Sequence, residues 1–131
     1  MIKKINHIAL VVPEMEEGKK FWTEVLGLQV EREEHVADQD VDVAFLPVGE
    51  SDIELLHPLS KDSGVAKFLQ KRGPGIHHIC LEVNDIEATL AQLLAAEIPL
   101  IDETPRIGAG GRRVAFIHPK GTGGVLVELY E

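Results

Sequence analysis

The stretch HIALVV at residues 7–12 returns as HICLEV at residues 78–83, which is 71 positions further along the chain. The run VAF at residues 43–45 returns at the same offset, at residues 114–116. Self-similarity at a fixed offset is the signature of a repeated structural unit. The sequence therefore predicts two copies of one module.

The ends of the two halves also match, but at a slightly larger offset. IEL at residues 53–55 corresponds to VEL at residues 127–129, where the offset is 74. The second half therefore has three more residues, around the glycine-rich turn Gly121–Gly124. Surface turns tolerate changes in length better than strands or helices do, so the insertion agrees with a duplicated module.

Each half predicts the same order of elements, βαβββ. Branched residues at 5–12 and 76–83 predict a first strand, and apolar residues at helical spacing predict helices at 14–26 and 85–96. Gly27 follows the first helix as a C-cap and Asp85 precedes the second as an N-cap. The remaining strands are expected at 28–34, 41–48 and 52–57 in the first half, and at 99–102, 113–118 and 124–130 in the second. We predict one α+β domain over residues 1–131, with module one at about 1–60, a connecting helix within about 61–74 (residues 64–71), and module two at about 75–131.

Composition excludes several classes of protein. The chain has 131 residues, enough for one domain, and no apolar run as long as a membrane span. Its net charge of −9 argues against nucleic acid as a partner. The opening MIKKINHIAL runs into a strand pattern without a cleavage site, so no signal peptide is expected. A single cysteine, Cys80, suits a reducing compartment, and we expect a cytoplasmic protein without membrane attachment.

Two histidines and two glutamates occupy matching positions in the repeat. His7 and His78 lie in the first strands, and Glu54 and Glu128 lie in the last strands. Any one of them alone would more often be structural or face the solvent. Their pairing favours one site that binds one divalent metal ion; we expect Co²⁺ in vitro, with Mn²⁺, Ni²⁺, Zn²⁺ and Mg²⁺ as alternatives. The alignment of HI at 78–79 with HI at 7–8 selects His78 over its neighbour His77, which strand alternation turns to the opposite face.

Paired βαβββ modules resemble the vicinal-oxygen-chelate (glyoxalase-like) superfamily. Three runs are similar to its methylmalonyl-coenzyme A epimerase family: IELLHPLSKDS at 53–63, AKFLQKRGPGIHHICLEVNDI at 66–86 and PRIGAGGRRVAFIHPKGTGGVLVELYE at 105–131. The resemblance implies a central metal at His7, Glu54, His78 and Glu128, with glutamine in some members at the position of Glu54. It also implies an acyl-coenzyme A substrate and, by analogy, a homodimer.

The implied reaction interconverts (R)- and (S)-methylmalonyl-coenzyme A. The metal would stabilise the enolate that forms when the carbon between thioester and carboxylate loses its proton. The resemblance makes Glu128 the first candidate for a base. Some members place a second glutamate where Val43 stands here, and Asp42 is expected to point to the opposite face. We therefore predict a catalytic Glu54/Glu128 pair, without assigning either carboxylate to one face of the substrate.

The substrate is anionic, so an acidic protein must present local cations. We expect Lys120 and His118 of the HPK run, and the backbone N–H groups of Gly110 and Gly111, to bind it. Other available cations are Arg112 and Arg113 after the glycine run, and Lys67, Lys71 and Arg72 on the connecting helix. Three alternatives stay open: a glyoxalase I-type lactoylglutathione lyase, a ring-cleaving dioxygenase, and a metal-free small-molecule-binding protein of the same fold. The dioxygenase would leave Glu54 without a role.

Overall fold

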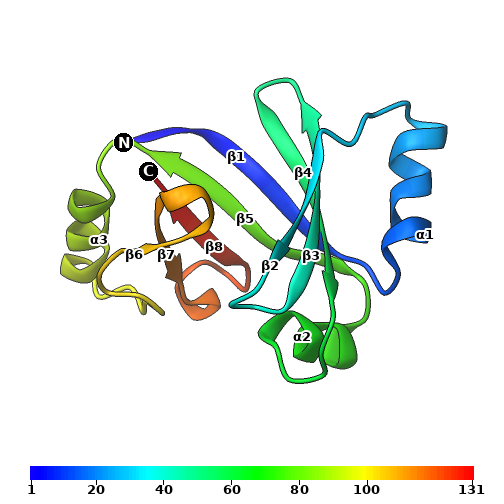
Figure 1. The fold of residues 1–131 in the computed structure, drawn as a ribbon. Helices are drawn as coiled ribbons and strands as arrows, with labels where there is room; N and C mark the ends of the chain where they lie inside the picture. The colour runs from blue at the N-terminus through cyan, green and yellow to red at the C-terminus, as the bar shows by residue number, and fades with distance from the viewer. The chain divides into compact units, whose positions relative to one another are not determined.

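The computed structural model describes the backbone of residues 1–131 and every side chain except that of Ala109. The chain forms two compact units, one made of His7–His77 and the other of Met1–Asn6 with His78–Glu131. The elements are β1 (Ile2–Val11), α1 (Met15–Lys20), a π-helix (Phe21–Val25), β2 (Arg32–Val36), β3 (Val41–Val48), β4 (Ser51–Pro58), α2 (Gly64–Arg72), β5 (Gly75–Val83), α3 (Ile86–Ala95), β6 (Arg106–Ile107), β7 (Arg113–Ile117) and β8 (Leu126–Tyr130), with short 3-10 turns at Ala109–Gly111 and Pro119–Gly121 (Figure 1).

The unit His7–His77 is a four-stranded sheet in the order β2-β3-β4-β1. Strands β1 and β4 are parallel, whereas β3 is antiparallel to both of its neighbours, β2 and β4. Alternate residues of β3 belong to different cores, because successive side chains of a strand point to opposite faces. Val41, Val43 and Phe45 pack with Val65 of α2, while Ala44 and Leu46 pack with Met15 of α1. The helices α1 and α2 therefore cover opposite faces of this sheet.

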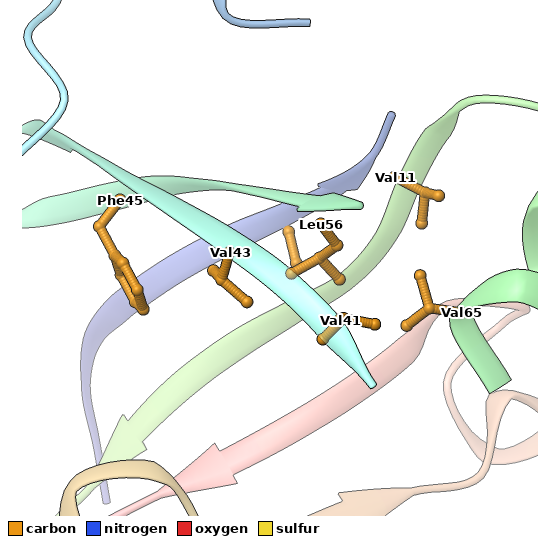
Figure 2. Packing of buried hydrophobic residues seen from close by; sticks show 7 residues of the cluster. Val11, Val41, Val43, Phe45, Leu56 and Val65 are labelled. Carbon is orange, nitrogen blue, oxygen red and sulfur yellow. The ribbon is translucent and has the colours of Figure 1, made fainter. Parts of the chain in front are cut away.

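The core under α2 is built from branched side chains. Figure 2 shows Val41, Val43 and Phe45 projecting from the same side of β3, with Leu56 of β4 beside them and Val65 of α2 opposite Val41. All of these residues are at least nine-tenths buried. Ser63 begins α2 by accepting a hydrogen bond from the Ala66 N–H at 3.1 Å, and Gly73 ends it with φ of +77°.

The second unit repeats this plan with β5-β8-β7-β6, in which β5 and β8 are parallel and β8 and β7 are antiparallel. Helix α3 covers one face through Ile86 and Leu90, which pack against Ala115, Ile117 and Leu129. The N-terminal half of β1 belongs to this unit: Lys3 Nζ lies 2.8 Å from Glu82 Oε1, and the Asn84 N–H donates to the Met1 carbonyl. Two copies of βαβββ with the same strand order confirm the predicted α+β fold.

Several predicted boundaries were wrong. The strand expected at 28–34 begins only at Arg32, and the helix expected at 14–26 changes after Lys20 into a π-helix, in which the Leu26 N–H donates to the Phe21 carbonyl at 3.1 Å. The strand expected at 99–102 is reduced to one bridge, between Leu100 and Ile117.

A side chain interrupts the strand expected at 99–102. The Asp102 carboxylate accepts the Phe116 N–H at 2.8 Å, so a side-chain oxygen occupies a place that a strand carbonyl would take. Pro99 and Pro105, on either side, have no N–H to donate to a ladder. A two-residue strand, β6, pairs with β7 instead. Across the described residues, the helices are too short or too polar to cross a membrane.

One ion pair joins the N-terminal strand to β5. Glu82 accepts hydrogen bonds from Lys3 Nζ at 2.8 Å and from Asn6 Nδ2 at 3.2 Å. The hydrogen bond from Lys3 is the main cause that lowers the pKa of Glu82 below its ordinary value of 4.5, and Asn6 and the charge of Lys4 add to it. Because the pKa is lower in the folded state, this carboxylate stabilises the fold above pH 4.5, and the contribution disappears as the pH falls through the lowered pKa.

We expect Glu82→Gln to lower the melting temperature at pH 7 and to have a smaller effect near pH 3. Circular dichroism melts between pH 7 and pH 3 would measure this difference. Glu103→Gln, on an exposed loop, is the control for the general effect of removing one negative charge. A difference between parent and Glu82→Gln that is constant over the whole range would contradict the assigned role.

Candidate metal centre

His7 and Glu54 form a close pair on the unit His7–His77. In the parallel register of β1 and β4, Ala9 lies opposite Glu54, so His7, two residues earlier, shares its face. His7 Nδ1 lies 2.9 Å from Glu54 Oε2. The imidazole is buried, and the carboxylate side chain is 13% exposed. A histidine and a glutamate 47 residues apart in the sequence are therefore brought into contact.

His78 and Glu128 form the corresponding pair on the second unit. In the parallel register of β5 and β8, Cys80 lies opposite Glu128, and His78 is again two residues earlier on the same face. His78 Nε2 lies 3.1 Å from Glu128 Oε2, and the burial of the two side chains matches that of the first pair. The repeat found in the sequence thus extends to strand register. The two pairs differ in the imidazole nitrogen that contacts the carboxylate, which is Nδ1 in His7 and Nε2 in His78.

The spacing within each pair fits two ligands of one ion. Nitrogen and oxygen ligands bind divalent metals at about 2.1 Å, so two adjacent ligand atoms lie about 3.0–3.4 Å apart at angles between a right angle and the tetrahedral angle. The two observed distances are 2.9 and 3.1 Å. Without a metal the same distance is a hydrogen bond from imidazole to carboxylate, and the proton on that nitrogen must leave when an ion binds. Neutral imidazole and carboxylate form a donor set that suits borderline divalent cations.

The expected distinction between His77 and His78 is observed. His77 packs its ring edge-on against Phe68 of α2, with centroids 5.0 Å apart, while His78 pairs with Glu128. The structure also places the two positions on β3 that were considered for a second base. Val43 is buried with Leu56 and has no acidic group. Asp42 lies on the other face, where its Oδ1 is 3.2 Å from His35 Nδ1.

The residues predicted to bind substrate lie in two turns of the second unit. His118 caps the turn Pro119–Gly121, and its Nδ1 accepts the Lys120 N–H at 3.0 Å, so the ring proton of the neutral imidazole is on Nε2. Gly110 and Gly111 have φ of +70° and +75°, values that favour glycine. The Gly111 N–H donates to the Gly108 carbonyl at 3.2 Å, which leaves it engaged within the turn.

Two phenylalanines border the pairs, and neither was among the residues predicted for the site. Phe45 lies directly opposite Glu54 on β3, and Phe116 lies directly opposite Glu128 on β7. An arginine guanidinium covers each ring, Arg32 at 3.8 Å from the centroid of Phe45 and Arg106 at 5.4 Å from that of Phe116. The repeated VAF run was the signal that could have identified them.

A family model described as the Glyoxalase/Bleomycin resistance protein/Dioxygenase superfamily matches residues 6–116, and the chain belongs to this superfamily. The human mitochondrial methylmalonyl-CoA epimerase is 44% identical over 96% of this chain and 72% of its own length. An ethylmalonyl-CoA/methylmalonyl-CoA epimerase of Cereibacter sphaeroides is 42% identical over 98% of both chains.

Solved structures agree with these relatives. The methylmalonyl-CoA epimerase of Mycobacterium tuberculosis superposes with a TM-score of 0.91 at 36% identity, covering 99% of this chain and 88% of its own. A methylmalonyl-CoA epimerase in complex with methylmalonyl-CoA and NH4+ also gives 0.91, at 32% identity and with 99% and 94% covered. A probable lactoylglutathione lyase of Vibrio cholerae is more distant, at 27% identity over 98% of this chain and 90% of its own length. Within the superfamily the chain is thus one of the methylmalonyl-CoA epimerases, which confirms the predicted resemblance.

Proposed function

We propose that this protein is an isomerase that interconverts (R)- and (S)-methylmalonyl-CoA by moving the proton of the carbon between the thioester and the carboxylate. The observation that carries the proposal is the pair of buried histidine–glutamate contacts, at 2.9 and 3.1 Å, in a chain 42–44% identical to epimerases over nearly its whole length. Proton transfer needs a carboxylate near the carbon and a positive charge near the oxygens. The pairs offer the carboxylates, and a divalent cation held by them would supply the charge.

His7, Glu54, His78 and Glu128 would together hold one divalent cation. The support is the matching register of the two pairs and the spacing of their nitrogen and oxygen atoms. When bound, the ion supplies Lewis-acid stabilisation of negative charge on the substrate oxygens. We expect Co²⁺ to support activity in vitro.

Glu54 and Glu128 would exchange the proton, one on each face of the carbon. Each carboxylate has a second oxygen besides the Oε2 that contacts its histidine, so one oxygen can bind the ion while the other accepts a proton. Val43 has no proton to transfer, and Asp42 lies on the other face of β3. Glu54 is thus the best available partner for Glu128.

The substrate's anionic groups would bind at the turns of the second unit. His118 presents Nε2–H as a donor because Nδ1 already accepts the Lys120 N–H. The Lys120 ammonium would contribute positive charge and the Gly110 backbone an N–H group. The expected contribution of the Gly111 N–H is not retained, because that N–H donates to the Gly108 carbonyl within the turn. We further propose a cytoplasmic homodimer, from the superfamily resemblance and the single reduced cysteine, Cys80.

The experiment is to incubate the metal-reconstituted protein with methylmalonyl-CoA in D₂O and to follow deuterium entry at the α-carbon. We expect fast exchange with Co²⁺, and loss of at least about 10²-fold in rate after a chelator removes the ion. Absence of exchange with Co²⁺, Mn²⁺, Ni²⁺, Zn²⁺ and Mg²⁺ would reject the epimerase function. Glutathione hemithioacetals would then test the lyase alternative, and plain ligand binding the metal-free one.

A further inference from the structure

Phe116 contacts both members of the His78–Glu128 pair. It lies directly opposite Glu128 in the antiparallel register of β7 and β8, where facing side chains on one side have Cβ atoms about 4.5–5.5 Å apart. Its ring meets the His78 ring edge-on, with centroids 5.6 Å apart and an interplanar angle of 84°. An edge-to-face contact restricts the rotation of both rings, so Phe116 limits the orientations of the imidazole.

Phe116 is itself held by residues of the loop that precedes β7. Its N–H donates to Asp102 Oδ2 at 2.8 Å, and its carbonyl accepts the N–H groups of Ile101 and Asp102 at 3.0 and 3.1 Å. The guanidinium of Arg106 lies over the ring, 5.4 Å from its centroid. Arg106 Nε is in turn 3.4 Å from Asp102 Oδ1. Asp102 therefore fixes both the backbone of Phe116 and the cation above its ring.

We propose that Phe116, clamped by Asp102 and Arg106, is a positioning residue that holds His78 and Glu128 ready to bind the metal. The inference rests on the metal centre of the proposed function, and it adds residues that are not among its proposed metal ligands. The similar row Arg32–Phe45–Glu54 on the other unit supports it, because a phenylalanine with an arginine over its ring also borders the other carboxylate. Residues that orient metal ligands through hydrogen bonds contribute about 10–100-fold to metal affinity, and we expect an effect of this order from Phe116.

The test compares two phenylalanine-to-leucine variants. Phe116→Leu removes the ring but keeps an apolar side chain. Phe68→Leu is a matched control, since the Phe68 ring also packs edge-on against a histidine, His77, at 5.0 Å and also carries an arginine, Arg72, at 5.7 Å. Competition with a chromophoric chelator would measure the dissociation constant for Co²⁺. We expect it to rise about 10–100-fold for Phe116→Leu and to stay unchanged for Phe68→Leu.

Additional variants separate positioning from a general loss of structure. Phe116→Tyr keeps the ring and is expected to restore parental Co²⁺ affinity. Arg106→Gln changes an exposed side chain and is expected to weaken affinity in the same direction, even if Phe116→Leu does not fold. At saturating Co²⁺ the exchange rate of Phe116→Leu should return toward that of the parent, because the variant loses affinity rather than a reacting group.

The possible failures are distinguishable. Parental Co²⁺ affinity in a folded Phe116→Leu or in Arg106→Gln would overturn the positioning role and leave the epimerase function intact. An equal loss in Phe68→Leu would also overturn it, because the effect would then be a general one. A parent chain that binds no divalent ion would reject the metal centre itself.

Discussion

Glu128→Gln is expected to reduce the rate of methylmalonyl-CoA epimerisation by about 10²–10⁴-fold, the contribution of a positioned general base. Glutamine keeps the size of the side chain and an oxygen that can bind a metal, but its amide does not accept a proton at neutral pH. Glu128 lies on β8 opposite Cys80 and Phe116, and because glutamine has nearly the same size and shape, the change should preserve the fold. The loss should therefore appear in kcat, with Co²⁺ affinity largely retained.

The measurement is the rate of inversion of each pure epimer together with bound Co²⁺ per chain. Glu34→Gln is the control, since Glu34 is also a strand carboxylate but is exposed and paired with Arg32 at 2.8 Å. It should retain the parental rate. A Glu128→Gln protein that binds Co²⁺ and inverts the substrate at the parental rate would remove Glu128 from the reaction.

Glu54→Gln gives the second large effect and tests whether two carboxylates share the reaction. If each carboxylate serves one face of the carbon, removing one stops inversion but leaves deuterium exchange on the face that the other serves. We therefore expect inversion to fall by about 10²-fold or more, while one epimer still exchanges its α-proton with solvent. Glu128→Gln should show the complementary pattern, in which the other epimer exchanges.

Nuclear magnetic resonance in D₂O would follow exchange and inversion together, starting from each epimer. Full activity of Glu54→Gln with metal bound would show that Glu54 is a ligand only, and the second proton donor would have to be sought elsewhere. Loss of both exchange and Co²⁺ would instead mark Glu54 as needed for binding the ion. These outcomes separate a role of Glu54 in proton transfer from a role in binding the metal.

The repeat and the residues of the two histidine–glutamate pairs could be predicted from the sequence alone. Matching positions in the repeat selected His7, Glu54, His78 and Glu128, and period-two alternation turned His77 to the other face. The runs from 53–63, 66–86 and 105–131 were sufficient to predict the epimerase family. Alternation is a local pattern, the repeat is an internal match, and the three runs are similar to a known family. None of these signals needs knowledge of which strand pairs with which.

The tertiary structure decided the features that depend on long-range pairing. Strand register brings His7 within 2.9 Å of Glu54 and places Phe116 opposite Glu128, and a shift by one residue would have turned either side chain away. The N-terminal half of β1 joins the second unit, through Lys3 and Glu82, although it precedes the first in sequence. Asp102 takes the Phe116 N–H and thereby ends a predicted strand. Competition between a side-chain oxygen and a strand carbonyl for one N–H is settled by three-dimensional position, which periodicity along the chain does not encode.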